Sequence, residues 1–122
     1  MSPSVRGIRG ATTIDADTAE QVSARVQELV TEMLERNNLA AEDLVSVILT
    51  ATEDVTSMYP ATAARGLGLD DVPLLGAREI SVEGGLPRCV RVLIHAETDL
   101  SREKVRHVYL HGARVLRDDL PD

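Results

Sequence analysis

The residues from Cys89 to Ala96, CVRVLIHA, constrain the fold most, because two kinds of side chain alternate along them without interruption. Alternation with a period of two is typical of a β-strand that turns one face toward a core. One set of side chains is uniformly apolar: Val90, Val92, Ile94 and Ala96. The other set carries a guanidinium in mid-strand: Cys89, Arg91, Leu93 and His95. We therefore expect a strand with one core face and one face that presents a charge.

The residues that precede this strand predict a hairpin. Gly84-Gly85 separates two β-branched runs within 78–96, and glycine reaches the positive φ angles of a tight turn without steric cost. Glu79 and Arg91 would then lie on the two arms of the hairpin. A guanidinium among short neighbours is costly to bury unless it meets a carboxylate or an anionic ligand. The strand thus requires a negatively charged partner, either inside the protein or bound to it.

Composition excludes several classes of function. The 122 residues carry 20 acidic and 13 basic side chains, a net charge of −7, so nucleic acid and anionic membranes would be repelled on average. Tyr59 and Tyr109 are the only aromatic residues that could stack on bases. All basic residues except Lys104 are arginine, which suits recognition of a small acid but also follows from GC-rich coding. We expect no nucleic-acid partner and no membrane partner.

The single cysteine, Cys89, excludes an internal disulfide and a multi-cysteine metal site, which fits a reducing compartment. The sequence shows neither the apolar stretch of a signal peptide nor an apolar run of membrane-spanning length. These features predict a cytoplasmic protein.

The remaining pattern predicts one α+β domain over residues 1–122. Strands are expected at 5–14, 45–52, 72–79 and 106–111, and helices are expected after 17–20 and at Pro60, with a single helical turn at 102–105. Asp17 would cap the first helix, and Asn37-Asn38 would end it. A helix over 106–111 is the alternative; it would place His107 and His111 four residues apart, as in some metal sites.

These elements suggest one mixed sheet with helices packed on one face. The other face would be left uncovered, so we expect an oligomer with functional sites between subunits. The tail, about 112–122, is expected to be mobile enough to fold back over a site.

The sequence lacks a nucleophile beside a base, a phosphate-binding loop and a GxGxxG motif before a helix. What remains is a set of arginines with one glutamate and one tyrosine on extended segments. Such a set suits binding and electrostatic stabilisation of a small anion.

Four separated segments carry a resemblance to a known family: VRGIRGATT, ATEDVTSMYPATAARGLG, VPLLGAREISVEGGLPRCVRVLIH and RHVYLHGARVLRDDL. They lie in the same order as in the trimeric α/β class of monofunctional chorismate mutase, which the chain resembles over nearly its whole length. The resemblance implies a sandwich that forms a homotrimer through its sheets, with sites between subunits. It also implies conversion of chorismate to prephenate by a Claisen rearrangement, without cofactor or metal, in phenylalanine and tyrosine synthesis.

The resemblance further implies a role for individual residues. Arg91 would lie beside the ether oxygen whose bond to carbon breaks, and Glu79 would accept a hydrogen bond from the ring hydroxyl. Arg9 and Tyr109 would hold the substrate. The adjacent subunit would contribute Tyr59, Ala61 and Arg65. The cleft would be lined by Leu75, Gly76, Cys89 and Leu116, and covered by Arg117.

The chain departs from the pattern of this family at three positions of the implied site. Thr62 stands near the mouth of the site, where some relatives carry lysine, Gly76 stands where some carry cysteine, and Tyr59 replaces a more usual phenylalanine. These differences bear on substrate capture more than on the chemistry.

Two other functions would use similar residues. A non-catalytic trimeric regulatory protein would bind a small acid with the same arginines and leave it unchanged. An imine deaminase-like enzyme on a similar trimeric sandwich would need an arginine and backbone donors, but not the pair of Glu79 and Arg91.

Overall fold

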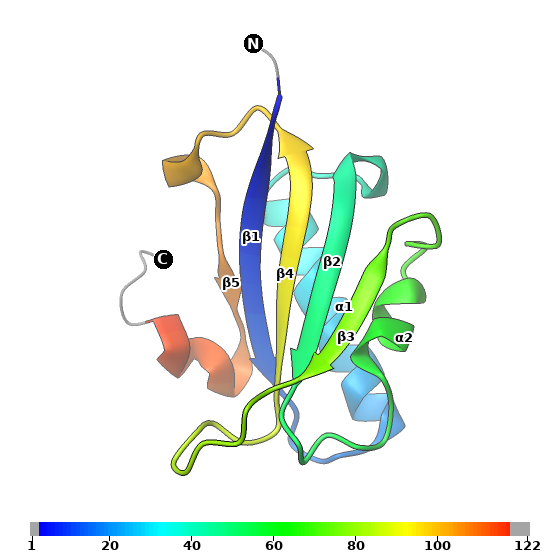
Figure 1. The fold of residues 1–122 in the computed structure, drawn as a ribbon, viewed down its shortest axis with the longest axis vertical. Helices are drawn as coiled ribbons and strands as arrows, with labels where there is room; N and C mark the ends of the chain where they lie inside the picture. Colours follow the sequence, from blue (N-terminus) through cyan, green and yellow to red (C-terminus); the bar gives the residue numbers. More distant parts are fainter. Residues whose placement is uncertain (1–2, 118–122) are drawn as a thin grey trace.

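The structure is a computed structural model that describes residues 3–117. Within that range the chain forms one mixed five-stranded sheet with the order β3-β2-β4-β1-β5 (Figure 1). The central strand β4 is antiparallel to both of its neighbours, whereas β2 and β3, and β1 and β5, pair in parallel. The strands are β1 (Ser4–Thr13), β2 (Leu44–Ala51), β3 (Leu74–Arg78), β4 (Cys89–Thr98) and β5 (Val108–Tyr109). The predicted mixed sheet is confirmed.

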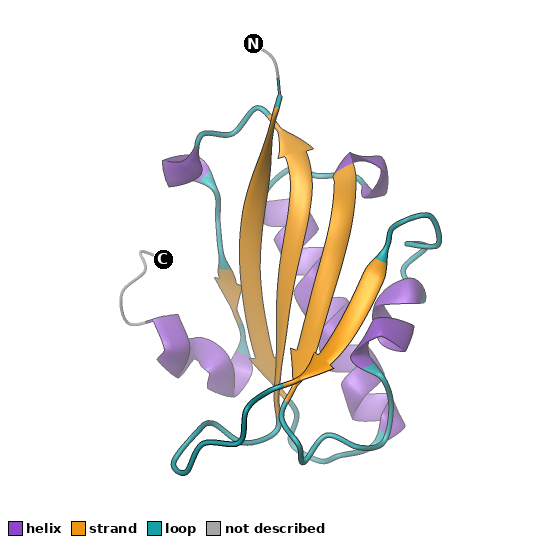
Figure 2. Cartoon of the chain, viewed as in Figure 1, coloured by secondary structure: helices purple, strands orange, loops and turns teal. Residues whose placement is uncertain are grey.

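Both α-helices lie on the same face of this sheet (Figure 2). They are α1 (Ala19–Arg36) and α2 (Pro60–Arg65), and short 3₁₀ helices occur at Ala41–Asp43, Arg102–Lys104 and His111–Arg117. Helix α1 ends as predicted, because Asn38 adopts a positive φ of 53°. Its N-cap is Thr18 and not Asp17, since the Thr18 hydroxyl accepts from the Gln21 amide. No helix within the described range is both long enough and apolar enough to cross a membrane.

The core lies between the sheet and α1 and confirms the alternation predicted for β4. Val90, Val92, Ile94 and Ala96 are all buried there, together with the apolar stripe of α1. Burying each of the larger side chains stabilises the fold by roughly 1.5–3 kcal/mol. Helix and sheet approach most closely at Gly10, where an added Cβ would lie 2.4 Å from the Met33 sulfur. A glycine in mid-strand therefore lets α1 approach β1.

The predicted hairpin between residues 78 and 96 is wrong. Strand β3 pairs with β2 and not with β4, so β2 separates the two predicted arms. The turn itself is present, because Gly84 has a φ of +83° and the Gly85 amide donates to the Val82 carbonyl. Glycines specify a local reversal of direction, but the hydrogen-bond partner of β3 is set by the free edge of β2.

The prediction of a strand near the end of the chain is confirmed in shortened form. Strand β5 spans only two residues, and the 3₁₀ helix His111–Arg117 follows it. The alternative of one helix over 106–111 is wrong. His107 accepts from the Arg9 amide through Nδ1, whereas His111 lies 2.8 Å from a Glu28 oxygen, so the two histidines have different surroundings.

The hydrogen bonds of Asn37 connect the last turn of α1 to the backbone of Arg106, and replacing Asn37 tests how much they contribute to stability. Its buried side chain donates to the Met33 and Arg106 carbonyls and accepts from the Arg106 amide. We expect Asn37→Ala to lower the free energy of unfolding in urea by roughly 1–3 kcal/mol, because buried backbone groups lose their partner. The exposed Glu35→Ala in the same turn should change it by about 0.5 kcal/mol or less. Equal effects of the two variants would contradict this role of Asn37.

Candidate active site

Four residues with predicted catalytic roles project from the sheet face opposite α1, which we call the open face. Residues paired across neighbouring strands share a face, and Ala11 is paired with both Arg91 on β4 and Tyr109 on β5. Thr50 on β2 is also paired with Arg91, and Arg9 lies two residues from Ala11 along β1. Glu79 follows directly after β3. The open face is defined by these side chains: Arg9, Ala11, Thr50, Glu79, Arg91, Leu93 and Tyr109.

Arg91 and Glu79 meet although the predicted hairpin does not exist. The Arg91 Nε lies 3.6 Å from a Glu79 oxygen, across the end of β2. The Arg91 side chain is 52% exposed and that of Glu79 is 24% exposed, so within one chain the short neighbours of Arg91 do not bury its guanidinium, as the sequence interpretation assumed they would. An ion pair this long and this exposed contributes about 1 kcal/mol or less. The guanidinium therefore keeps most of its hydrogen-bonding capacity for a ligand.

Thr50 is a site residue that the sequence interpretation missed. Its hydroxyl donates to the same Glu79 oxygen that faces Arg91, so it fixes the position of the carboxylate. The available signal was weak: in LVSVILTA the polar Ser46 and Thr50 alternate with buried positions, which places them on the face opposite the core. Nothing in that pattern indicated which carboxylate Thr50 would meet.

Cys89 lies beneath one side of the open face. It is buried in a small cluster with Ala11 and Ala113, against which Tyr109 and Leu116 pack. Burial raises the pKa of the Cys89 thiol, and the nearby Arg91 guanidinium only partly offsets this effect. The thiol is therefore a packing group that supports Tyr109 and Leu116. The side chain of Arg117, predicted to cover the site, lies outside what the structure describes.

The other predicted lining residues belong to a different part of the molecule. A groove of about 1030 Å³ runs between α2, the chain before it and β3. Its lining includes five predicted site residues: Tyr59, Ala61, Thr62, Arg65 and Gly76. Arg91, Arg9, Glu79 and Tyr109 are not in that lining. Within one chain, the predicted residues therefore form two separate groups.

Tyr59 and Leu75 are unusually exposed for large side chains. Tyr59 at the start of α2 is 80% exposed, and Leu75 on the edge strand β3 is 63% exposed. Leu75 is paired with Ile48 on β2, so it lies on the open face, whereas its neighbour Gly76 points to the helix side. Strand β3 thus contributes residues to both groups.

Asp17 fixes the segment that leads to Tyr59. Its carboxylate accepts from the amide and hydroxyl of Thr56 and from the Ser57 amide. The Thr56 hydroxyl bond is the main reason why the pKa of Asp17 is lowered from 3.8 to about 2. The predicted capping residue therefore ties the start of α1 to the groove.

Comparison with known proteins gives consistent results. Residues 5–120 match the family described as chorismate mutase type I. The chain is 52% identical over 117 residues to the chorismate mutase AroH of Thermus thermophilus, covering 95% of this chain and 96% of that protein. It is 42% identical over 117 residues to the protein of the same name in Bacillus subtilis (strain 168), covering 95% and 92%.

A solved structure of a chorismate mutase from Clostridium thermocellum superimposes with a TM-score of 0.88 at 43% identity, covering 90% of this chain and 98% of that one. The chain belongs to the chorismate mutase type I family. Membership confirms the predicted resemblance, the α+β fold and the prediction of an enzyme, an isomerase of the chorismate mutase class. The comparisons favour neither a regulatory binding protein nor an imine deaminase-like enzyme.

The Asp17 contacts predict how the stability of this chorismate mutase depends on pH. A carboxylate whose pKa is lowered on folding stabilises the native state above its unfolded value, and that stabilisation is lost as pH falls through the folded value. Asp17→Ala should therefore lower the melting temperature near neutral pH. The difference from wild type should shrink as pH falls from 3.8 toward about 2. A difference that persists unchanged over this range would show that the Asp17 charge is not responsible.

Proposed function

We propose that the chain converts chorismate to prephenate on the open face, at a site that a neighbouring subunit completes. The observation that carries this proposal is the state of Arg91. It is a half-exposed guanidinium whose ion pair with Glu79 is long, and it shares one sheet face with Arg9, Glu79 and Tyr109. This arrangement provides fixed positive charge and hydrogen-bond donors for a dicarboxylate.

The proposed reaction places modest chemical demands on the protein. A rearrangement within one molecule needs no proton shuttle, so the enzyme assists by holding the folded conformer and by stabilising charge that develops as the ether bond breaks. Arginine suits this task because its charge does not titrate away and its donors have fixed geometry. A preorganised donor aimed at a developing negative charge in a water-poor cleft contributes roughly 3–4 kcal/mol. We assign that role to Arg91.

The neighbouring residues receive roles that fit their positions. Glu79, fixed by the Thr50 hydroxyl, would accept a hydrogen bond from the ring hydroxyl of the substrate. Tyr109 would hold the substrate from β5, supported by packing against the Cys89 cluster. His107 holds the backbone amide of Arg9, and the exposed Arg9 side chain forms no ion pair within residues 3–117, so it can bind a carboxylate. No metal or cofactor has a role in this mechanism.

A homotrimer would unite the two groups of predicted residues. Tyr59, Ala61 and Arg65 line a groove that does not reach Arg91 in the same chain, so a single chain offers only half of each site. Exposed Tyr59 and Leu75 are the kind of apolar surface that subunit contacts cover. In the proposed trimer, the groove residues of one subunit, with Thr62 and Gly76, would close over the open face of the next. Leu116 and Arg117 would complete the cover.

The role of Arg91 predicts the effect of its replacement. Arg91→Ala should lower kcat/KM for chorismate by about 100-fold to 1,000-fold, because the developing charge loses its donor. Arg91→Lys should recover little of this loss, since a point charge on a flexible stem lacks the fixed fork. The loss of chorismate absorbance measures the rate, and circular dichroism establishes that the variants fold.

Arg36→Ala is the matched control, because it removes one exposed arginine from α1, on the other side of the sheet. Its turnover should equal that of wild type. Near-wild-type turnover by Arg91→Ala would refute the role assigned to Arg91.

If each active site is shared between two subunits, two variants that are inactive alone should regain activity when they assemble into mixed trimers. Arg65→Ala and Arg91→Ala chains should each be inactive alone, because each lacks one half of every site. When equal amounts are unfolded and refolded together, a cyclic trimer with random mixing regains about a quarter of its sites intact. Turnover should rise to about that fraction of wild type. Mixed trimers that remain inactive, although mass spectrometry shows that they formed, would place both arginines in one subunit's site.

A further inference from the structure

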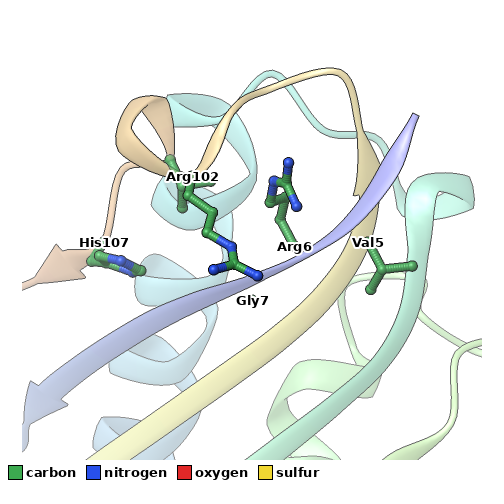
Figure 3. A pocket seen from close by; sticks show the side chains of 6 residues that line it. Val5, Arg6, Gly7, Arg102 and His107 are labelled. Carbon is green, nitrogen blue, oxygen red and sulfur yellow. The ribbon is translucent and has the colours of Figure 1, made fainter. Parts of the chain in front are cut away.

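A second cavity lies away from the candidate active site, between β1 and the connection that leads to β5. It has a volume of about 290 Å³. Figure 3 shows basic side chains from both segments around it. None of its lining residues contacts the substrate in the proposed reaction, although His107 holds the backbone amide of Arg9. They are Val5, Arg6, Gly7, Arg102, Val105 and His107.

The backbone of β1 presents hydrogen-bond donors to this cavity. The Arg9 amide points away from β4 and donates to His107 Nδ1 at 2.9 Å. Amides two residues apart in a strand point to the same side, so the amides of Val5 and Gly7 also point away from β4, together with the carbonyls of the same residues. Strand β5 covers this edge of β1 only at Gly10 and Ala11. The edge beside the cavity therefore has no neighbouring strand among the described residues.

The side chains add positive charge and one neutral donor. Arg6 uses its Nε to donate to the Leu100 carbonyl, which leaves its two terminal nitrogens for other partners. Within residues 3–117, neither Arg6 nor Arg102 forms an ion pair, and no carboxylate lines the cavity. Because His107 Nδ1 accepts from Arg9, the proton of the neutral imidazole lies on Nε2. Burial and the nearby Arg9 charge lower the pKa of His107, which keeps it neutral.

We propose that this cavity binds a small anion through a carboxylate or phosphate group, with Arg6 and Arg102 as cationic ligands and the Gly7 amide and His107 as neutral donors. Guanidinium groups grip the oxygens of either anion through parallel hydrogen bonds, and inward-facing amides add fixed dipoles. The volume admits an anion of about ten non-hydrogen atoms or fewer. In a chain with a net charge of −7, two guanidinium groups beside a cavity that no carboxylate lines create a local positive potential, which attracts a small anion. The proposal does not depend on the proposed catalytic function.

Titration of the intact protein with inorganic phosphate and, separately, with succinate tests the proposal. Isothermal calorimetry at physiological ionic strength should show saturable binding of at least one anion. Comparison of the two titrations distinguishes binding of a phosphate group from binding of a carboxylate group. Amide spectra of isotope-labelled protein should show that the Gly7 resonance shifts along the same titration curve. Absence of saturable binding by both anions would overturn the proposal.

The turn that carries Arg102 offers a matched pair of variants. Arg102→Ala and Lys104→Ala each remove one exposed positive charge from the 3₁₀ helix Arg102–Lys104, but only Arg102 lines the cavity. We expect Arg102→Ala to weaken binding about tenfold, the effect of losing one charge-assisted hydrogen bond. Lys104→Ala should weaken it less than about twofold. Equal weakening would indicate diffuse surface attraction and would overturn the proposed site.

The arginines of the open face are a competing place for the same anions, so binding is also measured in Arg91→Ala. Retained affinity in that variant, with the Gly7 shift preserved, supports a separate site. Loss of all binding in Arg91→Ala would show that the anions bind only on the open face, and the proposal would be wrong. Because this readout is binding and not turnover, it is independent of whether the chain rearranges chorismate.

Discussion

The structure depends on the packing of α1 against one face of the sheet. Val90, Val92 and Ile94 of β4 are buried in the same core cluster as the apolar side chains of that helix, and this fixes the register of the central strand. A shift of one residue would turn Arg91 into the core and an apolar residue toward solvent, at a cost of many kcal/mol. The position of the functional arginine is therefore a consequence of core packing. Gly10 belongs to the same arrangement, because its missing side chain lets α1 lie close to the sheet.

The order of strands then determines which groups surround Arg91. Its strand is central, so neighbours approach from both sides, and the two parallel edge strands bring in the polar groups. Strand β5 contributes Tyr109 on one side, and β3 leads to Glu79 on the other. Between Glu79 and Arg91 lies β2, whose Thr50 holds the carboxylate in place. Residues more than 40 positions apart in sequence meet because each is in register with its neighbour.

The features that could be predicted from the sequence are those that depend on local patterns of residues. The alternation of β4 and the end of α1 at Asn37-Asn38 were both confirmed, because each depends on residues a few positions apart. The hairpin was wrong because strand pairing is decided by distant edges, and the turn at Gly84-Gly85 is compatible with either partner of β3. Asp17 was placed at a helix cap, although its actual partners lie about 40 residues away. Thr50 was missed for the same reason, since its partner is set by tertiary structure.

The exposure of Arg91 also explains how a chain of this size carries a strong electrostatic group without losing stability. Burying a guanidinium during folding costs several kcal/mol unless excellent partners compensate, and Glu79 at 3.6 Å is a weak one. The fold avoids this cost by leaving the side chain half in solvent. In the proposed trimer, a neighbouring subunit and an anionic substrate would exclude that water, so desolvation and strong pairing would occur together. The attraction between Arg91 and the substrate would then be strongest when the substrate is bound and water is excluded, which are the conditions under which catalysis requires it.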